Sequence, residues 1–389
     1  MSITPLPDMS RIKRVLIIRL SAIGDVVHAL PIASALKIAY PHLEISWLVE
    51  EISAEIVEGN PYLHQVFVVP RSKWNQGRLY SPAVWKEYLV FLQKLRREKF
   101  DLTIDLQGYA KSAIFALSTG AAYKFGWWRL KDGSNLISKP LPKRETSLHR
   151  VDWFLDVARG LGVEEPVVKF PIFIPDEASH QVEKWLSEGR IQKGTSYAVI
   201  NPTAGNSTRM WGADKYSELI AWMAAELSLP SVLIGTKKEA EFCQCIIESA
   251  RQKLENVIPV SESNLLNFAG KTTLKELAAL LKGSVLHLCG DTGSTHIAAG
   301  VRTPVVSFYG ASDPHHAGPW GQLENVLAKR ELCHEQCNVR HCFFSQNDPT
   351  SHLPHPPNAK CMEAITVEEA KIQIRTALAK SSRSLESIS

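Results

Sequence analysis

The sequence lacks the features of a membrane-spanning or exported protein. It has no apolar run long enough to cross a bilayer, because Arg19 interrupts the most apolar stretch. Residues 1–14 (MSITPLPDMSRIKR) contain no apolar core of the kind that directs export. The seven cysteines are an odd number and form no small secreted framework. We therefore expect a cytoplasmic protein with reduced thiols.

Three signatures of common α/β enzymes are also missing. The dinucleotide-binding fingerprint needs three glycines after the first strand, and the corresponding loop has only Gly24. Glu50 could otherwise pass for a ribose-binding acid, but it lacks this partner motif. Neither Gly-x-x-x-x-Gly-Lys-Ser/Thr nor Gly-x-Ser-x-Gly occurs. These absences argue against nicotinamide-dependent dehydrogenases, P-loop nucleotide hydrolases and α/β hydrolases.

Length and composition indicate a globular protein large enough for two domains. The chain has 389 residues, of which 45% are hydrophobic and 22% charged. Residues 1–175 carry 23 Lys and Arg against 17 Asp and Glu, whereas residues 176–389 carry 21 against 23. Solvated surface side chains explain most such differences, but a basic first half also suits an anionic glycolipid at a membrane face. Because no recognised nucleic-acid-binding module is present, we expect no nucleic-acid partner.

Strand and helix patterns alternate along the chain, which predicts parallel βαβ units. In the first half we predict strands over 15–18, 44–49, 65–69 and 100–105, and helices over 29–39, 85–98 and 151–161. Segment 169–176 contains two prolines and is predicted to be an extended linker. In the second half we predict strands over 197–200, 231–234, 284–288 and 305–309, and helices over 214–226, 239–249, 274–282 and 366–379.

The first βα connection carries the most informative charged residue. Segment 15–31 (VLIIRLSAIGDVVHALP) reads as a buried strand, a turn over 21–24 and a helix. The start of such a helix lies at the carboxyl edge of the sheet, where open α/β folds bind ligands. Asp25 at this edge is either a helix cap or a base directed into a ligand site.

Two polar loops in the second half suit a phosphorylated ligand. Segment 201–211 (NPTAGNSTRMW) offers hydroxyl groups and the guanidinium of Arg209, which can bind a diphosphate. An ordinary polar loop with a surface arginine is the alternative. Segment 290–296 (GDTGSTH) joins a predicted strand to a helix, and its small residues allow a ligand to approach closely. There Asp291 can accept hydrogen bonds from sugar hydroxyls.

These segments carry a family resemblance. SAIGDVVHALP (21–31), IDLQGYAKS (104–112), GDTGSTH (290–296) and YGASDP (309–314) resemble the ADP-heptose:lipopolysaccharide heptosyltransferases, glycosyltransferase family 9, in the same order over roughly residues 14–365. The resemblance implies the GT-B fold, in which two Rossmann-like α/β domains face each other across a cleft. It implies an acceptor-binding domain over 1–172, a donor-binding domain over 173–362, and a final helix within 363–389 that packs back on the first domain.

The resemblance also implies roles for individual residues. Asp25 matches the catalytic carboxylate that takes the proton from the acceptor hydroxyl. Arg209 falls where the family usually has a lysine. The positive charge is retained, but the planar guanidinium of arginine differs in geometry from the ammonium group of lysine. The positions expected to bind the donor are Thr203, Arg209, Glu239, Asp291, Thr292, Gly293 and His296. We expect His149, Arg150 and Lys111 to contact the anionic acceptor.

The cysteines near the end of the second half leave two interpretations open. Cys333, Cys337, Cys342 and Cys361 could form a structural metal site or a disulfide-prone cluster. Their spacing is not that of tight Cys-x-x-Cys pairs, so free buried thiols are the alternative. The resemblance implies no catalytic metal.

The resemblance thus predicts metal-independent, inverting transfer of heptose from ADP-L-glycero-D-manno-heptose to the lipopolysaccharide inner core, on Kdo or a preceding heptose. It predicts no cofactor beyond the donor substrate, and peripheral contact with the cytoplasmic face of the inner membrane. A related enzyme with another nucleotide sugar or acceptor is one alternative. A non-catalytic nucleotide-sugar-binding protein is another, and a nicotinamide oxidoreductase is disfavoured by the missing glycines.

Overall fold

The computed structural model describes residues 6–76, 81–255, 257, 264–338, 340, 342–343 and 359–386. It divides the chain into two compact units, Met1–Phe173 and Ile174–Ser389. The division falls inside the segment 169–176 that the sequence predicts as a linker. The assignment of acceptor and donor to these units stays a prediction.

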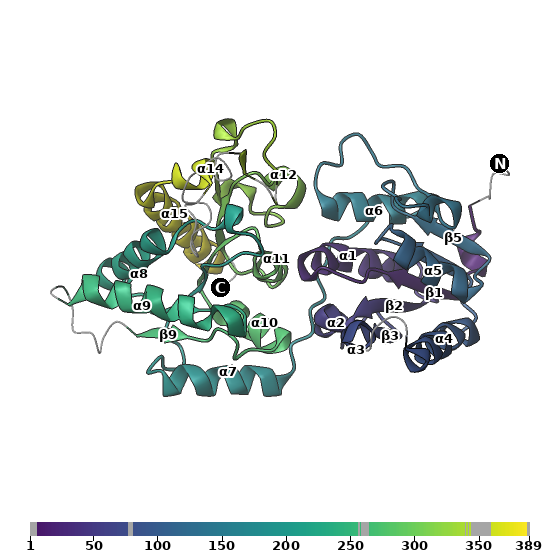
Figure 1. Cartoon of the computed structure of the whole chain (residues 1–389), viewed down its shortest axis with the longest axis horizontal. Coiled ribbons are helices and arrows are strands. Elements are labelled where there is room, and N and C mark those ends of the chain that lie inside the picture. The colour runs from purple at the N-terminus through teal and green to yellow at the C-terminus, as the bar shows by residue number, and fades with distance from the viewer. Residues whose placement is uncertain are drawn as a thin grey trace. The chain divides into compact units, whose positions relative to one another are not determined.

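Within its described residues, the first unit contains a six-stranded parallel sheet (Figure 1). The strands are β1 (Arg14–Ile18), β2 (Glu44–Glu50), β3 (Gln65–Val69), β4 (Leu102–Asp105), β5 (Tyr123–Gly126) and β6 (Lys139–Pro140). Their order in the sheet is β3-β2-β1-β4-β5-β6, which is the doubly wound Rossmann order. The chain reverses its direction of winding between β1 and β4, which pair directly.

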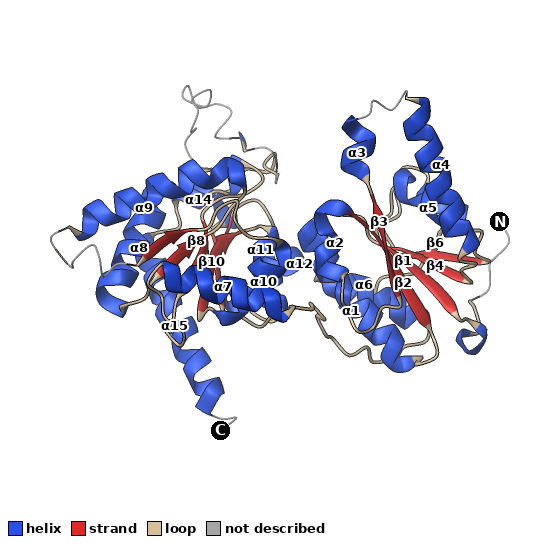
Figure 2. Ribbon diagram, turned by 90° about the horizontal axis from the view of Figure 1, so that it is seen from below, coloured by secondary structure: helices blue, strands red, loops and turns tan. Residues whose placement is uncertain are grey.

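Helices cover both faces of this sheet (Figure 2). They are α1 (Ile23–Ala39), α2 (Glu51–Val57), α3 (Arg71–Gln76), α4 (Pro82–Arg97), α5 (Ala110–Thr119) and α6 (Arg150–Gly160). Helix α1 packs against α2 and α6, while α4 packs against α5. Leu16 and Ile18 of β1 are buried with Phe67 and Phe115 in the core beneath α4 and α5.

The second unit repeats this plan over its described residues. Its strands are β7 (Ala198–Asn201), β8 (Ser231–Leu233), β9 (Leu265–Asn267), β10 (Leu286–Gly290), β11 (Val305–Tyr309) and β12 (Val326–Ala328). All pairs are parallel, and read from β9 to β12 the order is again that of a Rossmann sheet. The strands β7 and β10 meet at the reversal of winding, as β1 and β4 do in the first unit.

The helices of the second unit form two layers (Figure 2). They are α7 (Asp176–Glu188), α8 (Ala213–Leu227), α9 (Ala240–Leu254), α10 (Leu274–Gly283), α11 (Gly293–Gly300), α12 (Pro314–Ala317), α14 (Lys360–Glu363) and α15 (Val367–Glu386). Helix α8 packs against α9 and α15, and α10 packs against α7 and α11. The fully buried Trp211 stacks on Phe308 of β11, with ring centroids 4.1 Å apart.

The C-terminal helix α15 packs on α8 and β11, both in the second unit. Two ion pairs connect α15 to α8. Arg375 Nη2 lies 2.8 Å from Glu226 Oε2, and Lys371 Nζ lies 3.7 Å from Glu218 Oε1. Its predicted return to the first unit stays a prediction.

The first helix differs from its prediction. The sequence pattern predicts a turn over 21–24 and a helix from residue 29, whereas α1 already begins at Ile23. Gly24, which the pattern assigns to the turn, and Pro31 both lie within the helix. Pro31 is tolerated inside α1, where residues 26–36 are all buried and packing outweighs the lost backbone hydrogen bond. Asp25 consequently lies in the first turn of α1.

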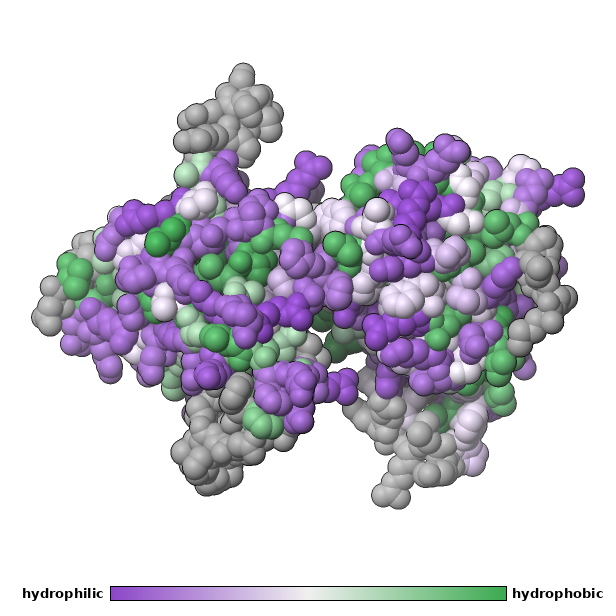
Figure 3. Space-filling view, turned by 90° about the horizontal axis from the view of Figure 1, so that it is seen from above, coloured by the Kyte–Doolittle hydropathy of each residue, from purple (hydrophilic) through white to green (hydrophobic). Residues whose placement is uncertain are grey.

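In the part of the chain that is described, we find no helix both long enough and apolar enough to cross a membrane. The face drawn in Figure 3 carries mostly hydrophilic residues with smaller apolar groups between them.

A buried histidine links the second sheet to the helix that follows β10. His287 of β10 donates from Nδ1 to the carbonyl of Val199 at 3.0 Å, since a carbonyl can only accept. Its Nε2 therefore accepts from the hydroxyl of Ser294 at 3.1 Å. Burial lowers the pKa of His287 to about 4, so the folded protein holds this ring neutral.

We expect His287 to destabilise the folded protein in acid. An unfolded histidine takes up its proton near pH 6.5, while the folded ring stays neutral until about pH 4. The unfolded state thus binds more protons in this window, and stability is lost as the pH falls through it. At about 1.4 kcal/mol per pKa unit, the loss is on the order of 3 kcal/mol.

The measurement is urea unfolding of the wild type and His287→Asn at about pH 7 and pH 4.5. The wild type should lose more stability between the two pH values than the variant does. Equal losses in the two proteins would contradict the assignment.

Candidate active site

Polar groups gather where β1 and β4 end in the first unit. These neighbouring strands lie at the reversal of winding, which is where doubly wound sheets bind ligands. The chain leaving β1 supplies Arg19 and then Asp25 at the start of α1, and the chain leaving β4 supplies Gln107. Gln107 Oε1 accepts hydrogen bonds from the backbone N–H groups of Leu20 at 3.0 Å and Ser21 at 3.3 Å. These two hydrogen bonds join the loop after β4 to the loop after β1.

Asp25 lies between two arginines. Its Oδ2 pairs with Nη2 of Arg19, and its Oδ1 pairs with Nη1 of Arg150 at 2.5 Å. The carboxylate is partly open to solvent, with 23% of its side chain exposed, whereas Arg19 is only 6% exposed. The two guanidinium groups favour the charged carboxylate and fix its orientation.

Arg19 is itself held in place from several sides. Its Nη1 donates to the carbonyl of Leu106 at 2.6 Å, and its guanidinium lies 5.4 Å from the ring centre of Phe154 in α6. In the sequence, Arg19 stands out first as an interruption of an apolar run. A cation directly after a buried strand was the available signal, since it needs a partner there.

A second buried carboxylate shapes the loop after β4. Asp105 accepts from the backbone N–H of Gln107 at 2.9 Å and of Gly108 at 2.8 Å, and from the hydroxyl of Ser112 at 2.8 Å. Burial raises its pKa to about 6. Gly108 has φ +74, and a Cβ there would lie 2.5 Å from Nε1 of Trp127, so the turn requires glycine.

The three predicted acceptor residues have different surroundings. Arg150 begins α6 and reaches Asp25, as described above. His149 is buried and caps α6, because its Nδ1 accepts a hydrogen bond from the backbone N–H of Val151 at 3.2 Å. Its ring packs edge-on against that of His28, with ring centroids 5.1 Å apart. Lys111 pairs with Glu50 at 3.2 Å. The structure thus brings Arg150 to Asp25 and gives His149 a capping role; contact with an acceptor stays a prediction.

In the second unit, Asn201 joins the two predicted donor loops. It ends β7, and its Oδ1 accepts from the backbone N–H and the hydroxyl of Thr203 at 3.1 and 2.8 Å. Its Nδ2 donates to the hydroxyls of Ser294 at 3.1 Å and Thr292 at 3.4 Å. The loops after β7 and β10 therefore lie side by side at the second reversal of winding. This role of Asn201 was not predicted from the sequence.

Arg209 and Asp291 meet across the same two loops. Arg209 Nη1 lies 3.1 Å from Asp291 Oδ2 and 3.3 Å from its backbone carbonyl. Ser312 donates to the same carboxylate oxygen at 2.6 Å. These bonds orient both side chains, and Asp291 offsets the charge of Arg209.

The loop after β10 ends in the N-terminus of α11. Thr292 is the N-cap of this helix and forms a capping box with Thr295, whose hydroxyl also donates to the carbonyl of Gly290 at 2.7 Å. Gly293 is the first helical residue, and His296 is buried one turn further. The N–H groups of a helical first turn attract anions such as phosphate.

Glu239 follows β8 and has a structural contact. Its Oε2 accepts from the backbone N–H of Thr236 at 2.6 Å and completes a capping box of the short 3₁₀ helix Lys237–Glu239. Its predicted contact with the donor ribose stays a prediction.

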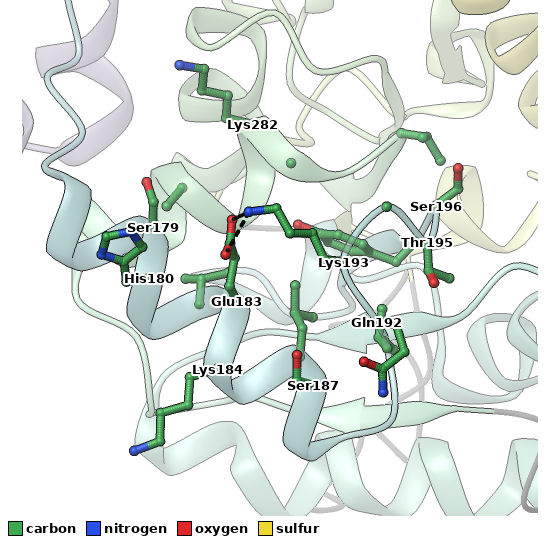
Figure 4. Close-up of a pocket in the computed structure, with 18 residues that line it drawn as sticks. Ser179, His180, Glu183, Lys184, Ser187, Gln192, Lys193, Thr195, Ser196 and Lys282 are labelled. Carbon is green, nitrogen blue, oxygen red and sulfur yellow. Dashed lines mark hydrogen bonds and ion pairs between the residues drawn. The ribbon is translucent and has the colours of Figure 1, made fainter.

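A cavity of about 860 Å³ lies elsewhere in the second unit (Figure 4). It is lined by α7 and by residues such as Tyr197 and Val285, which precede β7 and β10. In Figure 4, Lys193 and Glu183 point toward each other, and their charged atoms are 3.1 Å apart. This cavity is at the amino ends of the strands, whereas the predicted donor residues follow their carboxyl ends, and none of those residues lines it.

The cysteines are free thiols. Burial, together with the neighbouring thiol of Cys333, raises the pKa of Cys361 to about 12. Among the residues with described positions, no group of three or more His, Cys, Asp or Glu could hold a metal ion. Cys342 and Cys361 are buried and Cys333 and Cys337 are half-buried, and the choice between a structural site and free thiols stays a prediction.

Comparison with known proteins places the chain in a family. A family model described as glycosyltransferase family 9 (heptosyltransferase) matches residues 88–347. Lipopolysaccharide core heptosyltransferase OpsX of Haemophilus influenzae is 26% identical over 356 residues, which cover 91% of this chain and 93% of that protein.

Solved structures agree on the fold. The glycosyltransferase family 9 structure from Veillonella parvula has a TM-score of 0.72 at 20% identity and covers 95% of this chain and 97% of its own. The E. coli heptosyltransferase WaaC, solved with ADP, has a TM-score of 0.67 at 21% identity, with coverage of 94% and 99%. The GT-B fold class predicted from the sequence, with two Rossmann-like domains, is confirmed. The chain belongs to glycosyltransferase family 9 and is a glycosyltransferase of the heptosyltransferase type.

Proposed function

We propose that the protein transfers heptose from ADP-L-glycero-D-manno-heptose to the inner core of lipopolysaccharide, on Kdo or a preceding heptose. The observation that carries the proposal is the geometry of Asp25, a partly exposed carboxylate fixed by two arginines at the ligand-binding edge of the first sheet. The names of the relatives, a lipopolysaccharide core heptosyltransferase among them, support the choice of sugar and acceptor.

Asp25 acts as the general base in this proposal. A carboxylate offers about four lone-pair sites, so the pairs with Arg19 and Arg150 leave sites for the proton of an acceptor hydroxyl. As that proton passes to Asp25, the hydroxyl oxygen attacks the anomeric carbon of the donor, and the bond to the departing phosphate oxygen breaks. Attack on the face opposite the leaving group inverts the anomeric centre.

The second unit binds the donor. The N–H groups at the start of α11 and the guanidinium of Arg209 provide donors for a diphosphate, and Thr203 and Thr292 lie in the same two loops. The same groups stabilise the charge that develops on ADP as it leaves, which removes the need for a metal ion. The structure of WaaC with ADP supports this choice of nucleotide.

The acceptor and the cellular location follow from the same proposal. We propose an anionic glycolipid acceptor, which the basic first half of the chain suits. Reaction with such a lipid places the protein at the cytoplasmic face of the inner membrane, in peripheral contact with it. Arg150, beside Asp25 and partly exposed, is suited to contact an acceptor carboxylate or phosphate.

The proposal is tested by incubating the protein with ADP-heptose and truncated lipopolysaccharides that end at Kdo or at the first heptose. ADP release and a product heavier by one heptose, with EDTA present, are expected. Binding of the donor without ADP release with any acceptor would indicate a non-catalytic binding protein. Transfer only after addition of Mg²⁺ would contradict the metal-independent mechanism.

Asp25→Asn tests the general base. It should lower the transfer rate by about 10²–10⁴-fold, because the amide cannot take the acceptor's proton, while ADP affinity changes by less than about threefold. The rate and the ADP dissociation constant are measured separately. Asp132→Asn is the matched control, since Asp132 is an exposed residue of the same unit with φ 51, which asparagine tolerates. Substantial turnover by Asp25→Asn would remove the residue from this role.

Arg209→Ala tests whether Arg209 binds the diphosphate of the donor. A charge-assisted hydrogen bond is worth about 1.5–3 kcal/mol, so ADP should bind roughly tenfold more weakly or worse. Titration calorimetry with ADP measures this loss. Arg375→Ala is the control, because it removes an exposed ion pair on α15. If both variants bind ADP like the wild type, Arg209 does not hold the donor.

A further inference from the structure

An apolar pocket in the first unit contains Lys111, one of the predicted acceptor residues, but none of the groups assigned a step in the reaction above. Its volume is about 490 Å³, within the range of small-molecule sites. Its walls come from the ends of β-strands and from α3, α4 and α5, and the aromatic and aliphatic residues among them are Leu20, Val69, Trp74, Val84, Trp85, Tyr88, Ile114 and Phe115.

The pocket opens on an exposed apolar surface. Trp85 of α4 and Ile114 of α5 line it, although 52% and 47% of these residues are exposed to solvent. Leu89, one turn beyond Trp85, and Leu117, one turn beyond Ile114, are exposed as well. Adjoining apolar side chains at the mouth of a pocket indicate a binding surface rather than scattered surface residues.

The charged groups of the pocket carry one excess positive charge. Glu50 is almost buried and pairs with Arg71 at 2.6 Å and with Lys111 at 3.2 Å. Both cations line the pocket and remain partly exposed, so each can reach a second anionic partner. An occupant that complements this arrangement has a long apolar part and one anionic end.

We propose that this pocket binds one hydrocarbon chain of an anionic lipid, with the lipid's charged end at Lys111 and Arg71. Trp74, Tyr88 and Phe115 surround the chain, and Trp85 and Ile114 cover it at the mouth. This site deepens the proposed function. Only the identity of the lipid rests on that function: it is the acceptor itself or a lipid beside the acceptor in the membrane. The site itself lies wholly within the first unit.

Fluorescence with cis-parinaric acid tests the site directly, because tryptophans at the pocket transfer energy to a bound polyene. The corresponding alcohol has the same chain and no charge. The wild type should bind the acid saturably and at least about fivefold more tightly than the alcohol. Lys111→Met should bring the two affinities within about twofold of each other, because one cation is lost.

A matched pair of α5 variants separates the pocket from the surface around it. Ile114→Glu places a charge in the mouth and should weaken binding of the acid at least tenfold, by roughly the cost of burying an unpaired charge. Leu117→Glu, at a similarly exposed position that does not line the pocket, should change it by less than about twofold. Circular dichroism and ADP binding verify that both variants are folded.

The proposal is overturned if the wild type does not bind the acid saturably, if the alcohol binds as tightly, or if the two α5 variants weaken binding equally. Dimerisation that Ile114→Glu abolishes, without binding of the acid, would make the occupant a second copy and would also overturn it. Transfer of heptose to a deacylated acceptor does not require the pocket. Heptose transfer can therefore be observed even if the pocket binds no lipid, and lipid binding can be observed even if no heptose is transferred.

Discussion

The pairing of Asp25 with Arg19 and Arg150 is the interaction on which this account depends. It ties the start of α1 to the end of β1 and to the start of α6. Arg19 is buried, and a carboxylate and a backbone carbonyl provide partners for its two Nη groups, which offsets much of the cost of burying this cation. The stability of this corner of the first unit and the orientation of the proposed base therefore have the same origin.

The two units place their polar groups by the same topological rule. In each sheet the strand that opens the unit pairs with the fourth strand, and the loops beyond these two strands lie side by side. Gln107 joins the loops in the first unit, and Asn201 joins them in the second. One amide side chain in each unit thus connects the two loops. The first unit places a carboxylate at this edge, and the second a guanidinium and a helix N-terminus.

Much of the fold could be predicted from the sequence, because buried parallel strands are short runs of branched apolar residues. The strand bounds 65–69 and 305–309 are those observed for β3 and β11. The short strands β5, β6, β9 and β12 escaped prediction, since none of them contains four branched apolar residues in a row. Asp25, Arg209 and Asp291 could be selected from loop position and resemblance. Asn201 and Gln107 could not, because each joins its own loop to one that is distant in the sequence and becomes its neighbour only when the strands align. Arg19 carried one signal, a cation directly after a buried strand, which the sequence prediction did not use.

In the proposed reaction, Asp25 receives the proton of the acceptor hydroxyl. A crystal structure of the protein with ADP-2-deoxy-2-fluoro-heptose and a truncated lipopolysaccharide acceptor tests this claim most directly. The account predicts the attacking hydroxyl within hydrogen-bond distance of the Asp25 carboxylate, with Arg19 still paired to it, and the diphosphate at Arg209 and the N-terminus of α11. An acceptor hydroxyl bound out of reach of Asp25, or beside a different base, would contradict it.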